Sequence, residues 1–324
     1  MDAQTNPTPT LQLSVIIPVY NSADIFPELH HRLVAVLEPA VKSFEIIAVL
    51  DGCRDRSAEV IGGVAGKDPR VKMIEFSRNF GHQAAITAGL EFVSGGTVII
   101  MDDDLEDPPE LLPRFLAKLD EGYDVVYGVR KRRHRPLLYR ILYRLFYRLL
   151  GSLVDVKIPY DAGDFCIVRR QVVDAINSMP ESNRYLRGMR AWCGFRQAGL
   201  EYDRGERFAS ESGYTFRKYI ALALDAIFSF SYKPLKFVSL AGFLIAGISF
   251  LYGARLFVGR LTGEYQNVPG WASLQVSILF LSGIQLISMG IVGEYMARIY
   301  DEVKRRPKFV IKNVVGIQPE RIHD

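Results

Sequence analysis

The chain is poor in cysteine and histidine, and nothing at its start is typical of a secretory leader. Its 324 residues include three cysteines and five histidines; Cys53, Cys166 and Cys193 are far apart, and the histidines show no metal-binding spacing. This pattern argues against a disulfide framework or a zinc site, and we interpret the cysteines as buried reduced thiols. The first ten residues contain no basic side chain, and Pro18 interrupts the first apolar run, so we expect no cleaved signal peptide.

The chain also lacks any pattern typical of nucleic-acid-binding proteins, although its formal net charge is +4. Residues 235–258 and 272–293 are each long enough to cross a bilayer, and the second segment has no charged residue. A buried hairpin of a soluble core is the alternative, but globular helices rarely stay apolar on every face. We therefore expect two transmembrane helices.

Basic residues flank the two predicted spans unevenly. The link at 259–271 carries one arginine and one glutamate, whereas a cluster of lysines and arginines follows the second span and further basic residues precede the first. The positive-inside rule then predicts that both flanks, and the large N-terminal region, lie in the cytoplasm.

An acidic cluster follows a short apolar run at 97–101 and reads DDDLEDPP. The β-branched run predicts a buried parallel strand, and open α/β sheets bind ligands at the carboxyl ends of such strands. Clustered carboxylates repel one another unless a cation neutralises them, and Mg²⁺ typically takes one or two carboxylates plus substrate phosphates. In an extended segment Asp102, Asp104 and Glu106 would point to one side. The alternative is a solvated turn in which Asp107 caps the next helix.

Strand-like runs alternate with amphipathic stretches over the first 130 residues. The predicted strands are 13–20, 44–50, 71–76, 97–101 and 124–127, and the predicted helices between them include 24–41, 81–93 and 110–120. This alternation predicts right-handed βαβ units and a mostly parallel sheet.

Side chains suited to a nucleotide follow the first three predicted strands. A nucleotide needs a slot for its base, a polar group for the base edge and donors for its phosphates. Each residue alone is ordinary loop chemistry, but together at one sheet edge they predict a nucleotide site. The candidates are Pro18, Tyr20 and Asn21 after the first strand, Asp51 after the second, Arg78 after the third, and Asp103 in the acidic cluster.

Several motifs resemble those of family 2 glycosyltransferases. They are VIIPVYN, EIIAVLDG, FSRNFGHQAAITAGL, MDDDLEDPPELLPRF, GYDVVYGVR, DAGDFCIVRRQVVDAI and VGEYMARIYDEVKRRP. More narrowly, the chain resembles polyprenyl-phosphate sugar transferases related to dolichol-phosphate mannose synthase and the bacterial undecaprenyl-phosphate glucosyl and aminoarabinosyl transferases. The likeness spans residues 11–312.

The resemblance implies an α/β fold of the GT-A (Rossmann-like) type, followed by a two-helix transmembrane domain. It implies that Asp102, Asp104 and Glu106 hold Mg²⁺ or Mn²⁺ against the diphosphate of a nucleotide sugar. Three positions depart from the family pattern: Glu106 replaces the usual glutamine, Leu50 replaces the first of two acids before glycine, and Ser22 replaces an acid.

An acceptor site is indicated by arginines that repeat every four residues in the apolar segment 137–150, as expected of an interfacial helix. A partner-helix surface in an oligomer is the alternative. By resemblance, lipid phosphate would be held by Arg130 and Arg140, with Arg207, Ser212 and Tyr214 nearby; Gly213 replaces a lysine of the family.

The resemblance further implies inverting transfer of one sugar, such as glucose from its UDP derivative, to undecaprenyl phosphate at the cytoplasmic face of a bacterial inner membrane. It places Asp164 at the position of the candidate catalytic base. A phosphate monoester has a second pKa of about 6 and is already largely ionised at neutral pH. We therefore hypothesise that Asp164 chiefly positions a substrate; proton abstraction and capping of a helix near Arg170 are the alternatives.

Two other functions share these features: a processive polysaccharide synthase, which needs more spans, and a non-catalytic nucleotide-sugar sensor, which does not need the acids. A homotetramer like those of some relatives is also an expectation. The expected organisation is a disordered start at 1–10, a catalytic domain at 11–210 with an interfacial helix near 136–150, a juxtamembrane segment at 211–234, spans at 235–258 and 272–293, and a basic tail at 294–324.

Overall fold

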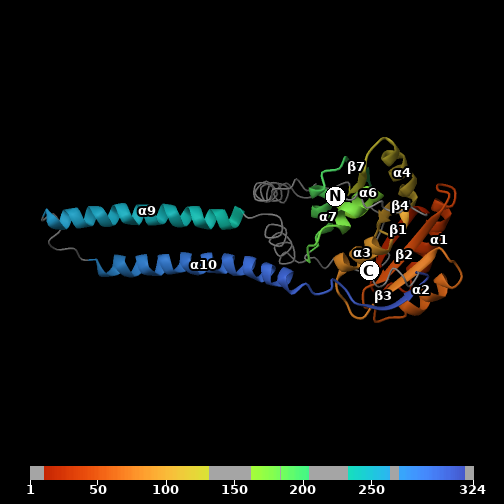
Figure 1. The fold of residues 1–324 in the computed structure, drawn as a ribbon, viewed down its shortest axis with the longest axis horizontal. Helices are drawn as coiled ribbons and strands as arrows, with labels where there is room; N and C mark the ends of the chain where they lie inside the picture. The colour runs from red at the N-terminus through yellow and green to blue at the C-terminus, as the bar shows by residue number, and fades with distance from the viewer. Residues whose placement is uncertain (1–10, 131–161, 183, 204–232, 263–269, 318–324) are drawn as a thin grey trace, which may run out of the picture. The chain divides into compact units, whose positions relative to one another are not determined.

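The structure is a computed structural model that describes residues 11–130, 162–182, 184–203, 233–262 and 270–317 (Figure 1). The chain divides into two units. The first comprises Met1–Tyr143, Val156–Gly213 and Arg306–Asp324, and the second comprises Arg144–Asp155 and Tyr214–Arg305.

The first unit contains a mixed sheet with helices on both faces. Its strands are β1 (Leu11–Val19), β2 (Phe44–Leu50), β3 (Val71–Phe76), β4 (Gly95–Ile100), β5 (Val125–Arg130), β6 (Ala162–Arg169), β7 (Gln197–Tyr202) and β8 (Ile311–Val315). Its helices are α1 (Phe26–Leu37), α2 (Ser57–Ala65), α3 (His82–Phe92), the 3-10 helix η1 (Pro109–Leu111), α4 (Leu112–Asp120), α6 (Arg170–Asn177) and α7 (Leu186–Trp192).

The sheet has the order β7-β5-β6-β4-β1-β2-β3-β8. Strands β3, β2, β1 and β4 are parallel, whereas β6 runs antiparallel to both β4 and β5. The carboxyl ends of the four parallel strands β1 to β4 therefore meet at one edge, as the alternation of strands and helices predicted.

Two apolar layers cover the sheet because successive side chains of a strand point to opposite faces. Val15 and Ile17 of β1 belong to the layer that contains α1, α2 and α4, whereas Ile16 belongs to the layer that contains α3, α6 and α7. Full burial of each such side chain contributes about 1.5–3 kcal/mol. The strands are buried on both faces, which explains their nearly continuous apolar sequence.

The last strand was not expected from the sequence, which predicted only a basic tail at 294–324. Within that segment β8 pairs antiparallel with the edge strand β3. The ring of Phe309 stacks on Phe76 with 5.1 Å between centroids, and Lys312 Nζ lies 2.6 Å from Glu75 Oε1. The backbone N–H of Ser77 donates to the carbonyl of Val310 at 2.9 Å. This pairing covers hydrogen-bonding groups that β3 would otherwise expose at the edge.

The second unit contains two long helices, α9 (Lys233–Leu261) and α10 (Trp271–Lys304). By length and composition, Leu235–Leu256 and Leu274–Lys304 could each cross a membrane. Large apolar side chains such as Phe243 are exposed along them. Such surfaces are unfavourable in water, which agrees with the two predicted spans.

Candidate active site

The loops after β1 and β2 are joined by backbone and side-chain hydrogen bonds. Asn21 has a left-handed backbone (φ 55°), and its Oδ1 accepts the N–H of Arg54 at 2.8 Å. The N–H of Ser22 donates to Ser57 Oγ at 3.0 Å. Tyr20 stays 48% exposed beside these loops, so its ring is available to a ligand. Pro18 is buried within β1, where it is in register with β2.

Asp51 fixes the loop between β3 and α3. Its buried carboxylate accepts the N–H groups of Phe80 at 2.6 Å and of Gly81 at 2.9 Å. The neighbouring Gly52 has φ 64°, and a Cβ there would lie 2.3 Å from the backbone nitrogen of Asn79, so only glycine fits this close approach. The exposed guanidinium of Arg78 lies 4.0 Å from the Phe80 ring centroid.

The acidic loop is bent, contrary to the extended geometry that the alternating acids predicted. Leu105 has φ 59°, a strained conformation for a residue with a side chain. Asp104 Oδ1 accepts the N–H of Glu106 at 3.0 Å, which closes a turn. Glu106 is therefore buried, only 2% exposed. Asp103 Oδ2 accepts the N–H of Tyr20 at 3.3 Å and ties the acidic loop to the loop after β1.

Asp102 has a buried carboxylate oxygen that suits a cation. Its Oδ1 is buried and accepts no hydrogen bond from the described residues. Burial and the nearby carboxylates raise the pKa of Asp102 to about 6, although His82 opposes this shift. His82 Nε2 lies 3.5 Å from that oxygen and 3.5 Å from Asp164 Oδ2. Burial disfavours the imidazolium, but these two carboxylates outweigh it and raise the pKa of His82.

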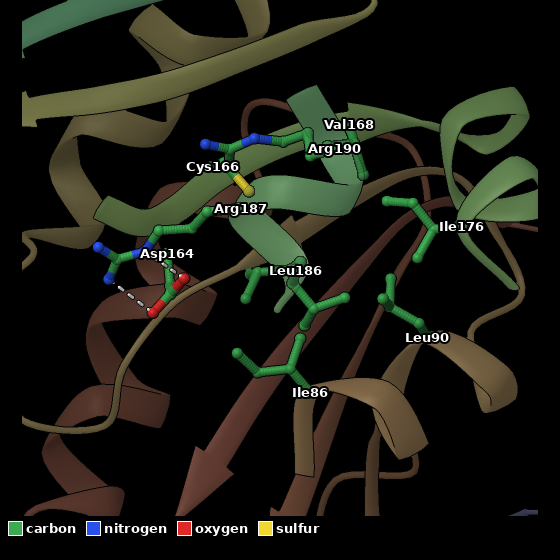
Figure 2. Close-up of a pocket in the computed structure, with 10 residues that line it drawn as sticks. Ile86, Leu90, Asp164, Cys166, Val168, Ile176, Leu186, Arg187 and Arg190 are labelled. Carbon is green, nitrogen blue, oxygen red and sulfur yellow. Dashed lines mark hydrogen bonds and ion pairs between the residues drawn. The ribbon is translucent and has the colours of Figure 1, made fainter. Parts of the chain in front are cut away.

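Asp164 lies in β6 and is bound by an arginine of α7. Arg187 Nε and Nη2 donate to its two oxygens at 2.7 and 2.8 Å, a bidentate pair that Figure 2 shows. Burial would favour the neutral acid, but Arg187 and His82 dominate and hold the pKa of Asp164 well below its usual range. The alternative role as a helix cap is wrong, because Arg169 is the N-cap residue of α6.

A small cavity lies beside this ion pair, between α3, β6, α6 and α7 (Figure 2). Its volume of about 20 Å³ is enough for roughly one water molecule. Aliphatic side chains such as Ile86 and Leu186 form most of its wall, with Asp164 and Arg187 at its rim. It is too small for a sugar.

Asp107 joins the acidic loop to two other strands. It accepts a hydrogen bond from the hydroxyl of Tyr202 at the end of β7. Arg130 Nη2, at the end of β5, lies 3.3 Å from Asp107 Oδ2. The alternative in which Asp107 caps the next helix is therefore wrong, because Pro108 precedes η1 and Asp107 turns inward, 1% exposed.

The carboxylates of the acidic loop fit a divalent cation whose remaining coordination positions are filled by substrate oxygens. Among the described residues no three acid, cysteine or histidine side chains converge into a preformed metal centre. The acids are hard oxygen donors, however, and the buried oxygen of Asp102 has no hydrogen bond there. Such a site suits Mg²⁺ or Mn²⁺, which bind through one or two carboxylates plus phosphate oxygens.

Four predicted acceptor residues lie outside the described part of the chain: Arg140, Arg207, Ser212 and Tyr214. Four side chains that the structure brings to the site were not predicted: His82, Asp107, Arg187 and Tyr202. His82 could have been predicted as a site residue, because it directly follows Gly81 at the start of the helix after the third strand. Nothing local marked Arg187 or Tyr202, which reach the site only through tertiary packing.

The sheet is mostly parallel, and its carboxyl edge carries an acidic loop beside the loops after β1, β2 and β3, which suit a nucleotide. This arrangement is typical of the GT-A class of α/β proteins. The mannosyltransferase PcManGT from Pyrobaculum calidifontis, solved with GDP-Man and Mn²⁺, has this fold: the match covers 94% of this chain and 90% of that one with a TM-score of 0.50. At 16% identity this likeness shows the fold alone.

The family model for glycosyl transferase family 2 matches residues 14–176, and the chain belongs to that family. A Bacillus subtilis (strain 168) relative, the uncharacterized glycosyltransferase YkcC, is 42% identical over 97% of each chain. The bactoprenol glucosyl transferase of Shigella phage SfV is 39% identical over 94% of this chain and 99% of that protein. The family and fold predicted from the motifs are confirmed.

Proposed function

We propose that this protein transfers a single sugar, with inversion, from a UDP-sugar such as UDP-glucose to undecaprenyl phosphate at the cytoplasmic face of a bacterial membrane. The observation that carries the proposal is the bent acidic loop at the sheet edge: it is tied to the loop of Tyr20, and among the described residues Asp102 Oδ1 in it accepts no hydrogen bond. Relatives named bactoprenol glucosyl transferase, similar over nearly the whole chain, support the choice of acceptor.

The donor lies across the loops after β1, β2 and β3. The exposed ring of Tyr20 covers the base, and Asn21 and Asp51 shape the slot through the loops that they hold. Arg78 faces the diphosphate. One or two of the carboxylates Asp102, Asp104 and Glu106 would hold a divalent cation, which would neutralise the charge that develops on the leaving nucleoside diphosphate.

The acceptor phosphate supplies the nucleophile. Its oxygen is largely ionised at neutral pH, so no side chain has to remove a proton before it attacks the anomeric carbon. Asp164 is held ionised by Arg187 and is a weak base in this state. We assign it to hydrogen bonding and orientation of the sugar, in the arrangement fixed by Arg187 and His82.

The lipid is bound by cations and by the membrane. Arg130 is 35% exposed and faces the acceptor phosphate, with Arg140, Arg207, Ser212 and Tyr214 supplying further contacts. The basic flanks of the two apolar helices support a multi-pass topology in which residues 11–210 and both termini lie in the cytoplasm. This topology brings a soluble nucleotide sugar and a lipid-bound phosphate to the same site.

The test incubates purified protein in proteoliposomes with undecaprenyl phosphate, Mg²⁺ or Mn²⁺ and a panel of labelled nucleotide sugars. We expect one sugar per lipid, and loss of at least 99% of the activity, roughly a hundredfold, in Asp104→Ala or with excess chelator. The matched control is Asp120→Ala at the exposed end of α4, which should keep its activity. A polymeric product would identify a processive synthase, and nucleotide binding without transfer would identify a sensor.

A further inference from the structure

Tyr202, Asp107 and Arg130 form a closed cluster at the ends of β7, the acidic loop and β5. The Tyr202 hydroxyl donates to Asp107 Oδ1, and Arg130 Nε donates to the Tyr202 oxygen at 3.2 Å. Arg130 Nη2 completes the triangle with Asp107 at 3.3 and 3.5 Å. Asp107 follows Glu106 directly, so the cluster is attached to the acidic loop.

The Tyr202 ring has little freedom to leave this position. A Cβ at Gly128 would lie 2.7 Å from its Cε1 atom, so the ring occupies space that only a glycine leaves open. On another side the ring meets the edge of Phe165, which follows Asp164, at 5.8 Å between centroids. Tyr202 is 2% exposed and its hydroxyl has partners on both sides, as a buried polar group requires.

The cluster leaves one part of Arg130 available. Its Nε and Nη2 bind Tyr202 and Asp107, whereas no hydrogen bond or ion pair of Nη1 is seen among the described residues, and the side chain is 35% exposed. Without the tyrosine hydroxyl, Arg130 could turn to bind both oxygens of Asp107 side-on, which is the preferred geometry of such pairs. That rotation would take Nη1 away from an incoming anion.

We propose that Tyr202 is a positioning residue for the acceptor phosphate. Its hydroxyl bridges Arg130 Nε and Asp107 Oδ1 and so keeps one guanidinium NH₂ directed at the phosphate, at a set distance from the acidic loop. The inference rests on the proposed function and adds a residue, outside the predicted site, that acts through Arg130.

The test measures steady-state transfer by Tyr202→Phe, which removes one oxygen atom. We expect the acceptor KM to rise about tenfold, the loss of roughly one charge-assisted hydrogen bond, while donor KM and Mn²⁺ affinity with UDP stay within about twofold. In an Arg130→Ala background the same change should add less than about twofold to the acceptor KM, because Tyr202 would have no arginine to position.

Tyr123→Phe is the matched control, because Tyr123 meets Lys118 and Arg196 through its ring face. It should behave as the wild type. An unchanged acceptor KM in Tyr202→Phe, or equal losses in both backgrounds, would overturn the inference while leaving the proposed function intact. Parallel changes of both KM values with a lower melting temperature would show a merely structural role and also overturn it. An inactive wild type would instead refute the proposed function and this inference with it.

Discussion

The Asp164–Arg187 pair allows positioning to be distinguished from proton abstraction. In Asp164→Asn the amide can still accept one hydrogen bond, but Arg187 loses its counter-charge. Removing one partner of a buried ion pair costs about 3–5 kcal/mol. Asp164 is 11% exposed and Arg187 32%, so solvent screening reduces the expected cost to about 2 kcal/mol.

This magnitude sets two measurable effects. For a unit of this size, about 2 kcal/mol lowers the melting temperature by about 4–8 °C. If the same free energy is lost from the transition state, turnover falls about 30-fold. Because the pKa of Asp164 lies well below its usual range, the wild-type group stays ionised from pH 6 to 9, and the defect should not be relieved as pH rises over that interval.

The assay is single-sugar transfer by Asp164→Asn and wild type in proteoliposomes between pH 6 and 9, with Asp120→Asn as the control for loss of an exposed carboxylate. A general base contributes about 10²–10⁴-fold, and its loss is relieved as pH rises. A defect above about 10³-fold that shrinks with increasing pH would therefore refute the positioning role. In an Arg187→Gln background, Asp164→Asn should add little further loss of stability.

Three further outcomes follow from the structure. Protonated Asp102 cannot ligate a cation, so Mn²⁺ affinity, followed by titration with UDP present, should fall as pH drops through about 6; an affinity constant from pH 5 to 8 would contradict this assignment. His82→Gln removes a charge that lowers the pKa of Asp102 and should move that midpoint upward; a midpoint that stays in place would exclude the coupling. Phe309→Ala removes the half-buried stack on Phe76 and should destabilise the first unit by about 1–2 kcal/mol, less than a fully buried phenylalanine; an unchanged melting temperature would show that this stack does not stabilise the β3–β8 pairing.

For the acids of the loop, the sequence predicted the position in the fold but not the local geometry. Their place after an apolar run predicted that they lie at the carboxyl edge of the sheet, and they do. The period-two expectation failed because Leu105 takes a left-handed conformation, which a turn closed by Asp104 stabilises. Periodicity describes regular strands, whereas this segment is a loop.

Local patterns in the sequence determined β1 to β4, the two apolar helices, and the residue types at the sheet edge, because alternation and long apolar runs are properties of neighbouring residues. Tertiary structure alone decided which side chains meet there. Asp107 and Tyr202 are 95 positions apart, and β8 reaches Glu75 across 237 positions. Their contacts depend on strand order and on space left by residues such as Gly128, which no local pattern encodes.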